Sequence, residues 1–175
     1  MKSILTLSFC LSIIFGYSQN STATAMATFS KNHFLVQYPK GWQVDTSGRL
    51  GTQVIVLSPL DNDSDKFSAN LNVIIQDLKG QNIDLNRYKE ITDDQLTQAV
   101  SDTTGMISKV IQSGKGSYYR VAYILTNGAL KLQINSICYI KDEKAYLLTF
   151  SNEYDQLERY KKISQDVLNS FSITN

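Results

Sequence analysis

Three aspartates at alternate positions are the sharpest chemical signal in this sequence. Asp61, Asp63 and Asp65 stand in the segment DNDSDK, and this spacing lets hard carboxylate oxygens converge on one cation, as in the first half of a calcium-binding loop. The pattern then stops, because its sixth position should be Gly and is Lys66, and its twelfth should be Glu and is Asn72. We predict a solvated hairpin tip, with a weak calcium contact as the open alternative, and no other metal or cofactor.

The remaining reactive residue types form no recognisable catalytic set. His33 is the only histidine, whereas general base catalysis and zinc binding both need further partners. Cys138 lies in an alternating apolar segment, which predicts a packed and inert thiol. The segment SGKGS (113–117) lacks the earlier glycine of a phosphate loop, since position 109 is Lys. We therefore predict no catalytic residue and no enzyme.

Tyrosine is the residue type best placed to make a binding surface. The chain has ten Tyr and seven Phe, and Tyr119, Tyr123 and Tyr139 fall in segments with a strand pattern. We expect some of them on an exposed sheet face, where they are candidates for binding a partner. Ordinary cross-strand packing is the alternative explanation for the same residues.

The elements that must position these residues follow from hydrophobic periodicity. The apolar pattern predicts strands over 34–38, 42–44, 52–58, 70–78, 109–112, 118–126, 130–140 and 145–150, and the strand over 52–58 is a nearly continuous apolar run, which suggests burial on both faces. Asp84 can cap a helix that ends near Val100, and a stripe at helical spacing predicts a long helix over 152–171. Short reversals between strands make neighbours antiparallel. The result is an α+β fold, a twisted antiparallel sheet with one inserted helix and one C-terminal helix.

The N-terminus has the order of a secretory signal. Lys2 precedes an apolar run from Ile4 to Phe15 and then small or polar residues. We predict a signal peptide over 1–18, a flexible leader over 19–30 and one domain over 31–175. An uncleaved short anchor is the alternative. Cys10 lies inside the apolar run, which does not fit lipidation, so we expect an exported, periplasmic or secreted protein that is not lipid-anchored and has no stable membrane span.

The charge balance argues against one class of partner. The chain has 17 basic and 16 acidic side chains, and loss of Lys2 would make the two numbers equal. Binding to a phosphate backbone needs a surplus of basic residues. We therefore do not expect nucleic acid as a partner.

Several segments, taken in order, are similar to the successive elements of a known domain family. "FLVQYPKGWQV", "ANLNVIIQDL", "DLNRYKEITDDQL", "GSYYRVAYIL" and "KAYLLTFSNEYDQLERYKKISQDVLNSF" resemble successive elements of PsbP-like and DcrB-like domains, over about residues 30 to 173. The resemblance implies an α/β/α sandwich around the antiparallel sheet. It also implies a binding module, because the family's members look like binding proteins with widely differing partners.

These observations lead to one expected function and one alternative. The expected function is an exported, non-catalytic binding module of the bacterial envelope, whose sheet face or strand edges contact another protein. The alternative is a carrier that holds a small apolar ligand between sheet and helices with Tyr and Phe side chains, for which a deep and dry pocket is required.

Overall fold

The computed structural model describes residues 24–60, 67–100 and 102–174. The predicted signal peptide and the three aspartates of the predicted hairpin tip, Asp61, Asp63 and Asp65, lie outside the described residues. Within the described part of the chain, no helix is long and apolar enough to cross a membrane.

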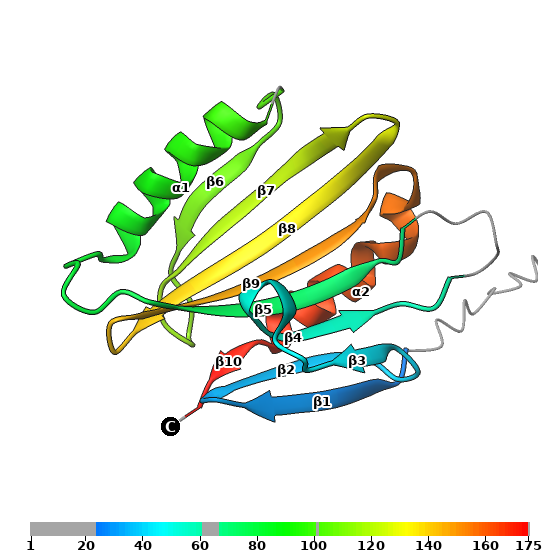
Figure 1. Ribbon diagram of the computed structural model, residues 1–175, viewed down its shortest axis with the longest axis horizontal. Helices are drawn as coiled ribbons and strands as arrows, with labels where there is room; N and C mark the ends of the chain where they lie inside the picture. Colours follow the sequence, from blue (N-terminus) through cyan, green and yellow to red (C-terminus); the bar gives the residue numbers. More distant parts are fainter. Residues whose placement is uncertain (1–23, 61–66, 101, 175) are drawn as a thin grey trace, which may run out of the picture.

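Within these described residues, ten strands form two antiparallel sheets, with two helices (Figure 1). The large sheet has the order β3-β4-β5-β9-β8-β7-β6 and the small sheet the order β1-β2-β10. The strands are β1 (Met26–Lys31), β2 (Phe34–Pro39), β3 (Gln43–Asp45), β4 (Thr52–Leu57), β5 (Asn70–Asp77), β6 (Ile107–Ile111), β7 (Tyr118–Asn127), β8 (Leu130–Lys141), β9 (Lys144–Glu153) and β10 (Ser172–Ile173). The helices are α1 (Leu85–Ala99) and α2 (Leu157–Ser170), with short 3-10 turns at Arg49–Gly51 and Tyr154–Gln156.

The β7-β8-β9 meander makes up one side of the large sheet, and its turns match the strand twist. Two residues, Asp142 and Glu143, join β8 to β9, and both have positive φ, at 51° and 54°. This is the backbone of a type I′ hairpin, whose twist agrees with that of the strands. Gly128, at φ 60°, opens the equally short turn between β7 and β8, a conformation that glycine adopts without steric cost.

Helix α1 packs on one face of the large sheet, against β6 and β7. The Asp84 side chain accepts a hydrogen bond of 2.8 Å from the Arg87 backbone N–H, so the predicted N-cap is confirmed. Apolar residues of α1 such as Tyr88 and Leu96 pack on a small cluster built around Tyr119 and Cys138. This cluster is the minor of two hydrophobic cores.

Helix α2 and the small sheet pack on the opposite face, over the major core. The predicted helical stripe is confirmed, since Tyr160, Val167 and Leu168 are buried and Ile163 packs beside them. They meet sheet residues that share one face by register, namely Val54, Val56, Leu71, Val73, Ile137, Tyr139, Tyr146, Leu148 and Phe150. Trp42 lies against Phe150 and Tyr160, with ring centroids 6.1 and 6.2 Å apart, and closes one end of this core.

The predicted flexible leader is wrong over residues 26–30, because these residues belong to strand β1. Its composition is small and polar, but its backbone pairs with β2 in register from Met26↔Pro39 to Lys31↔Phe34. Phe29 also packs on Phe34, with ring centroids 5.8 Å apart. A neighbouring strand supplies the order that local composition does not. The structure also divides the strands between two sheets, where one sheet was predicted.

The two helices lie over different strands of the large sheet. Seven strands at about 4.8 Å spacing span roughly 29 Å, whereas one helix with its side chains covers about 10 Å. On the α2 face, the small sheet packs beside α2, and α2 packs mainly on β8, β9 and β2. On this face β6 and β7 therefore extend beyond the helix and leave a hollow along its flank.

Candidate functional site

Two adjoining cavities follow the flank of α2. One has a volume of about 320 Å³ and lies between α2 and strands β6, β7 and β8. The second, of about 370 Å³, continues toward the turn between β6 and β7. Arg120, Gln165 and Leu168 line both. We call the two cavities together the α2 groove.

The floor of the α2 groove is built by strand register. Arg120, Ala122 and Ile124 alternate along β7 and therefore point to the same face. On β8 they are paired with Ile137, Asn135 and Gln133, and on β6 Arg120 is paired with Lys109. Paired residues of antiparallel strands project to the same side of the sheet, so this floor carries polar side chains in an otherwise apolar fold.

The wall of the groove comes from one stripe of α2. Lys161, Gln165 and Leu168 are spaced by four and three residues, so they lie on one side of the helix. Leu168 is buried and belongs to the major core, while Lys161 and Gln165 are exposed. The groove thus has an apolar base beside α2 and a polar rim.

Arg120 is the side chain that gives the groove a hydrogen-bond donor. It is half-buried, and its Nε is buried without a hydrogen-bond partner. The other two cations of the groove are engaged: Lys161 lies 3.6 Å from Glu158, and Lys115 donates to the backbone carbonyl of Asn169 at 2.6 Å. Among the described residues, Arg120 forms no hydrogen bond or ion pair. The groove can therefore donate hydrogen bonds to an anionic or polar group.

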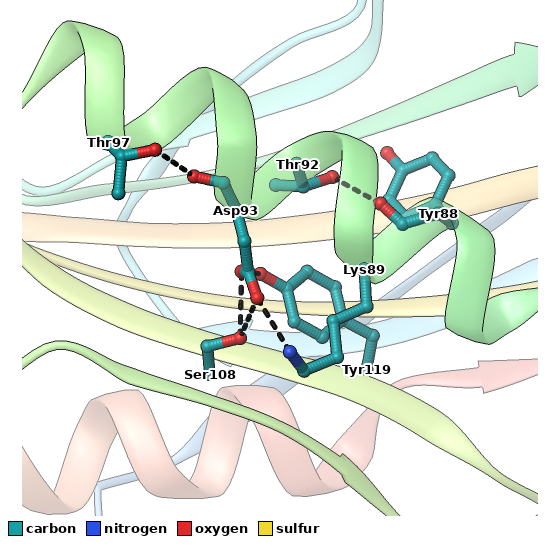
Figure 2. A network of polar contacts seen from close by, with 7 residues as sticks. All are labelled: Tyr88, Lys89, Thr92, Asp93, Thr97, Ser108 and Tyr119. Atoms are coloured by element: carbon teal, nitrogen blue, oxygen red, sulfur yellow. Dashed lines mark hydrogen bonds and ion pairs between the residues drawn. The ribbon is translucent and has the colours of Figure 1, made fainter.

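Tyr119, one of the predicted binding residues, lies on the other face of the sheet and is 1% exposed. Its hydroxyl donates to Asp93 Oδ1 on α1 at 2.6 Å (Figure 2). Ser108 Oγ, at 2.7 and 2.6 Å, and Lys89 Nζ, at 2.6 Å, donate to the same carboxylate. Tyr119 therefore anchors α1 and is not on an exposed sheet face.

The Asp93 network holds its carboxylate in the charged form. Burial by itself would raise the pKa of Asp93, but hydrogen bonds from Lys89, Ser108 and Tyr119 outweigh it and lower that pKa below the ordinary value of 3.8. For Tyr119 the effect has the opposite sign: burial and then the bond to Asp93 raise the pKa of its phenol. The network therefore links helix α1 to strands β6 and β7 through hydrogen bonds.

The other two predicted tyrosines are also separated. Tyr139 is 8% exposed and stacks between Tyr118 and Phe171, at centroid distances of 5.2 and 6.1 Å, beside the second cavity. Tyr123 is partly buried and packs on the minor core with Tyr119, and burial raises the pKa of its phenol. The three tyrosines therefore do not form one surface. Tyr139 lines the second cavity of the α2 groove, and Tyr123 lines the first.

The remaining predicted features fall at structural positions. His33 is exposed in the turn between β1 and β2, at φ 65°. Cys138 is fully buried, and burial raises the pKa of its thiol to about 12, which agrees with the predicted inert thiol. The segment SGKGS forms the turn between β6 and β7, closed by a 3.0 Å bond from Gly116 N to Ser113 O. The described residues contain no group of three or more His, Cys, Asp or Glu that could hold a metal.

Sequence reasoning missed Arg120 and Gln165. One signal was available for Arg120: it is the only charged residue within the apolar run YYRVAYIL, at a strand position whose period places it away from the minor core. Gln165 gave no comparable signal, because it lies beside charged residues on the face of the helix that the sequence pattern predicts to be exposed.

The family model PsbP matches residues 24–173. The chain belongs to the PsbP family. This confirms the resemblance drawn from the sequence and extends it to include β1. No curated protein matches the sequence.

Solved structures of PsbP-like fold agree with this assignment. Cyanobacterial PsbP (CyanoP) from Synechocystis sp. PCC 6803 has a TM-score of 0.62 at 17% identity, over 91% of this chain and 98% of that one. LpqN of Mycobacterium tuberculosis, involved in cell envelope biogenesis, has a TM-score of 0.60 at 11% identity, over 86% and 91%. A Bacteroides thetaiotaomicron protein has a TM-score of 0.56 at 12% identity, over 85% of this chain and 48% of that one. At these identities the likeness concerns the fold, so the α+β class is confirmed. The PsbP-like family is in general non-catalytic.

Proposed function

We propose that this PsbP-family chain is an exported, non-catalytic binding module of the bacterial envelope, and that it contacts a protein partner through the α2 groove. Export is supported by the signal-like N-terminus. The description of LpqN as a protein of cell envelope biogenesis is in keeping with an envelope location for this chain.

A single observation carries the choice of surface. The Nε of Arg120 is buried without a partner where the two cavities of the α2 groove meet. A buried polar group that lacks a hydrogen bond costs about 1–3 kcal/mol, and a group of this kind calls for an explanation such as a functional role or a bound water or ion. A partner that supplies an acceptor would remove this cost.

The carrier alternative has less support. It requires a deep, dry pocket between sheet and helices, but that space holds the packed major core, including Phe150, Tyr160 and Phe171. The cavities beside this core have apolar lining residues, but Arg120, Asn135 and Gln165 line them too, and these polar side chains are poor contacts for an apolar ligand.

Photo-crosslinking in cells of the source organism tests the proposal. A photoreactive amino acid at Gln165, which is exposed in the groove, is compared with one at Asn86, which is exposed on α1. We expect one recurrent protein attached at position 165 and not at position 86. Identical products at both positions, or none at 165, would contradict a groove-specific protein partner. A small molecule that copurifies with the native protein would favour the carrier.

A further inference from the structure

We propose that the α2 groove recognises a carboxylate, presented by an acidic segment of the partner protein, and that Arg120 is the residue that binds it. This inference rests on the proposed function and names the chemistry of the partner.

Arg120 differs from the other arginines in having no hydrogen-bond or ion-pair partner in the described part of the chain. Arg49 Nε lies 2.9 Å from Asp45, and Arg87 lies 3.0 Å from Glu90. Arg159 donates to Gln156 and packs over the Tyr160 ring. Arg120 has neither an acid nor an acceptor among the described residues, although it is more buried than Arg87. A guanidinium has five N–H donors in a planar fork, and those of Arg120, which lines both cavities, have no acceptor among the described residues.

The neighbour across the strand pair adds a second, independent observation. Lys109 on β6 is paired with Arg120 on β7, and Lys109 likewise has no ion pair among the described residues. Like charges directly opposite each other on a sheet are destabilising. An anion between the two side chains would convert this repulsion into two attractions.

The charge of the groove has the sign that an acidic segment needs. Lys115, Arg120 and Lys161 line the two cavities, against one acidic residue, Glu158, in a chain whose charges nearly balance. Glu158 is on α2 and lies 3.6 Å from Lys161, so the sheet side of the groove presents no carboxylate to Arg120.

The shape of the donor and of its surroundings favours a carboxylate on a polypeptide. Arginine binds carboxylates through two parallel N–H···O bonds, which is the strongest common side-chain pairing. The second cavity adds apolar and aromatic contacts from Tyr118, Ile137 and Tyr139. Two adjoining cavities, one with an anion site and one with an apolar base, suit successive side chains of an extended segment better than a lone small ion.

The first test asks whether the crosslink at position 165 depends on Arg120. Arg120→Gln is expected to reduce the yield of the crosslinked partner by about tenfold or more, since loss of one member of a desolvated charge pair has effects of this size. Arg120→Lys keeps the charge but loses the fork and is expected to be intermediate. The matched control, Arg87→Gln, removes the same charge from α1 and is expected to leave the yield unchanged. An unchanged yield in Arg120→Gln would overturn this inference while leaving the proposed partner in place.

The second test is independent of any partner. In the purified, isotope-labelled protein, the Arg120 Nε–H signal is followed by NMR while sodium acetate is added, with sodium chloride at equal ionic strength as reference. We expect a saturable shift of this signal with acetate. No shift with acetate, or a saturable shift with sodium phosphate alone, would overturn the carboxylate assignment, even if a protein is crosslinked in cells.

A stability measurement separates a binding role from a structural one. Because Arg120 has no internal partner, Arg120→Gln is expected to leave the Tm of the free protein unchanged or slightly higher. A clear fall in Tm, with the crosslink yield unchanged, would show that Arg120 serves the fold and would overturn its role in recognition.

Discussion

Replacing Asp93 with Ala should destabilise the protein by far more than the same change one residue later. Asp93 accepts hydrogen bonds from Tyr119, Ser108 and Lys89 and its side chain is 21% exposed. Asp94 follows it on α1 and is exposed. Asp94→Ala therefore reproduces the change in helix propensity without touching the network.

The magnitude follows from what each donor loses. The Tyr119 hydroxyl belongs to a residue that is 1% exposed, and a buried donor left without an acceptor costs about 1–3 kcal/mol. Ser108 and Lys89 are partly exposed and can be rehydrated, so together they add about 1 kcal/mol. Alanine returns about 0.5 kcal/mol of helix propensity. We expect a net loss of about 2–3 kcal/mol in the free energy of unfolding, or a Tm lower by about 5–12 °C for a chain of this size.

Thermal and urea unfolding at pH 7 measure this loss, and a double-mutant cycle locates it. Tyr119→Phe alone should cost about 1–2 kcal/mol, and the double variant should cost less than the sum by about 1 kcal/mol, because the two residues share one bond. The reasoning is refuted if Asp93→Ala and Asp94→Ala agree within about 0.5 kcal/mol, the usual range of surface substitutions.

The network also makes the stability lost in Asp93→Ala depend on pH, in a direction that follows from the pKa of Asp93. The pKa of Asp93 in the folded protein is lower than its ordinary value of 3.8, so the folded state favours the charged carboxylate. The stabilisation is fully present above the ordinary pKa and is lost as the pH falls through the lower, folded value. The difference between wild type and Asp93→Ala is therefore expected to be constant from pH 7 to about pH 5 and to shrink below pH 3.8.

Three further predictions concern other parts of the fold. Because Cys138 is buried and its pKa is raised to about 12, an aromatic disulfide reagent at pH 8 should leave this thiol unmodified in the native protein and modify it in urea; rapid native labelling of Cys138 would contradict the described packing. Phe171→Ala should cost about 3–5 kcal/mol in urea unfolding, since Phe171 is fully buried against Phe34 and Tyr139, while Leu50→Ala, at an 88% exposed site, should have almost no effect. Asp84→Ala should cost about 1 kcal/mol and speed hydrogen exchange in the first turn of α1; equal exchange in Asp84→Ala and wild type would show that the cap bond does not stabilise this helix.

The elements of the fold could be predicted because they depend on local patterns. The stripe of α2, with Tyr160, Val167 and Leu168, is visible as a helical period, and the strand over Leu130–Lys141 as a period of two. Asp84 acts on a backbone N–H only three residues away, so its role as a cap is local too. The ends of these elements still differ from the predicted ones. Strand β9 continues to Glu153 because its pairing with β8 continues to Leu132, and α2 begins at Leu157, later than its sequence pattern indicates.

Strand β1 and the second sheet could not be predicted in this way. Met26–Lys31 has no regular alternation of apolar residues, and its order comes from pairing with β2 and from the packing of Met26 and Phe29 on the major core. Backbone pairing leaves no mark in the sequence of the strand that receives it, because any residue except proline can supply the hydrogen bonds.

The candidate site also depends on both local sequence patterns and packing between distant residues. By itself the sequence determined the α+β class, the two helices, the PsbP-like order of segments and the near balance of charges. A period of two also says that Tyr119 and Arg120 point to opposite faces, but not which face a helix covers. Only the tertiary structure decided that α1 covers Tyr119 through Asp93, while α2 lies over β8 and β9 and leaves Arg120 beside an open groove. The physical reason is that the position of a helix on a sheet is fixed by packing between residues far apart in the chain, and such packing has no local pattern.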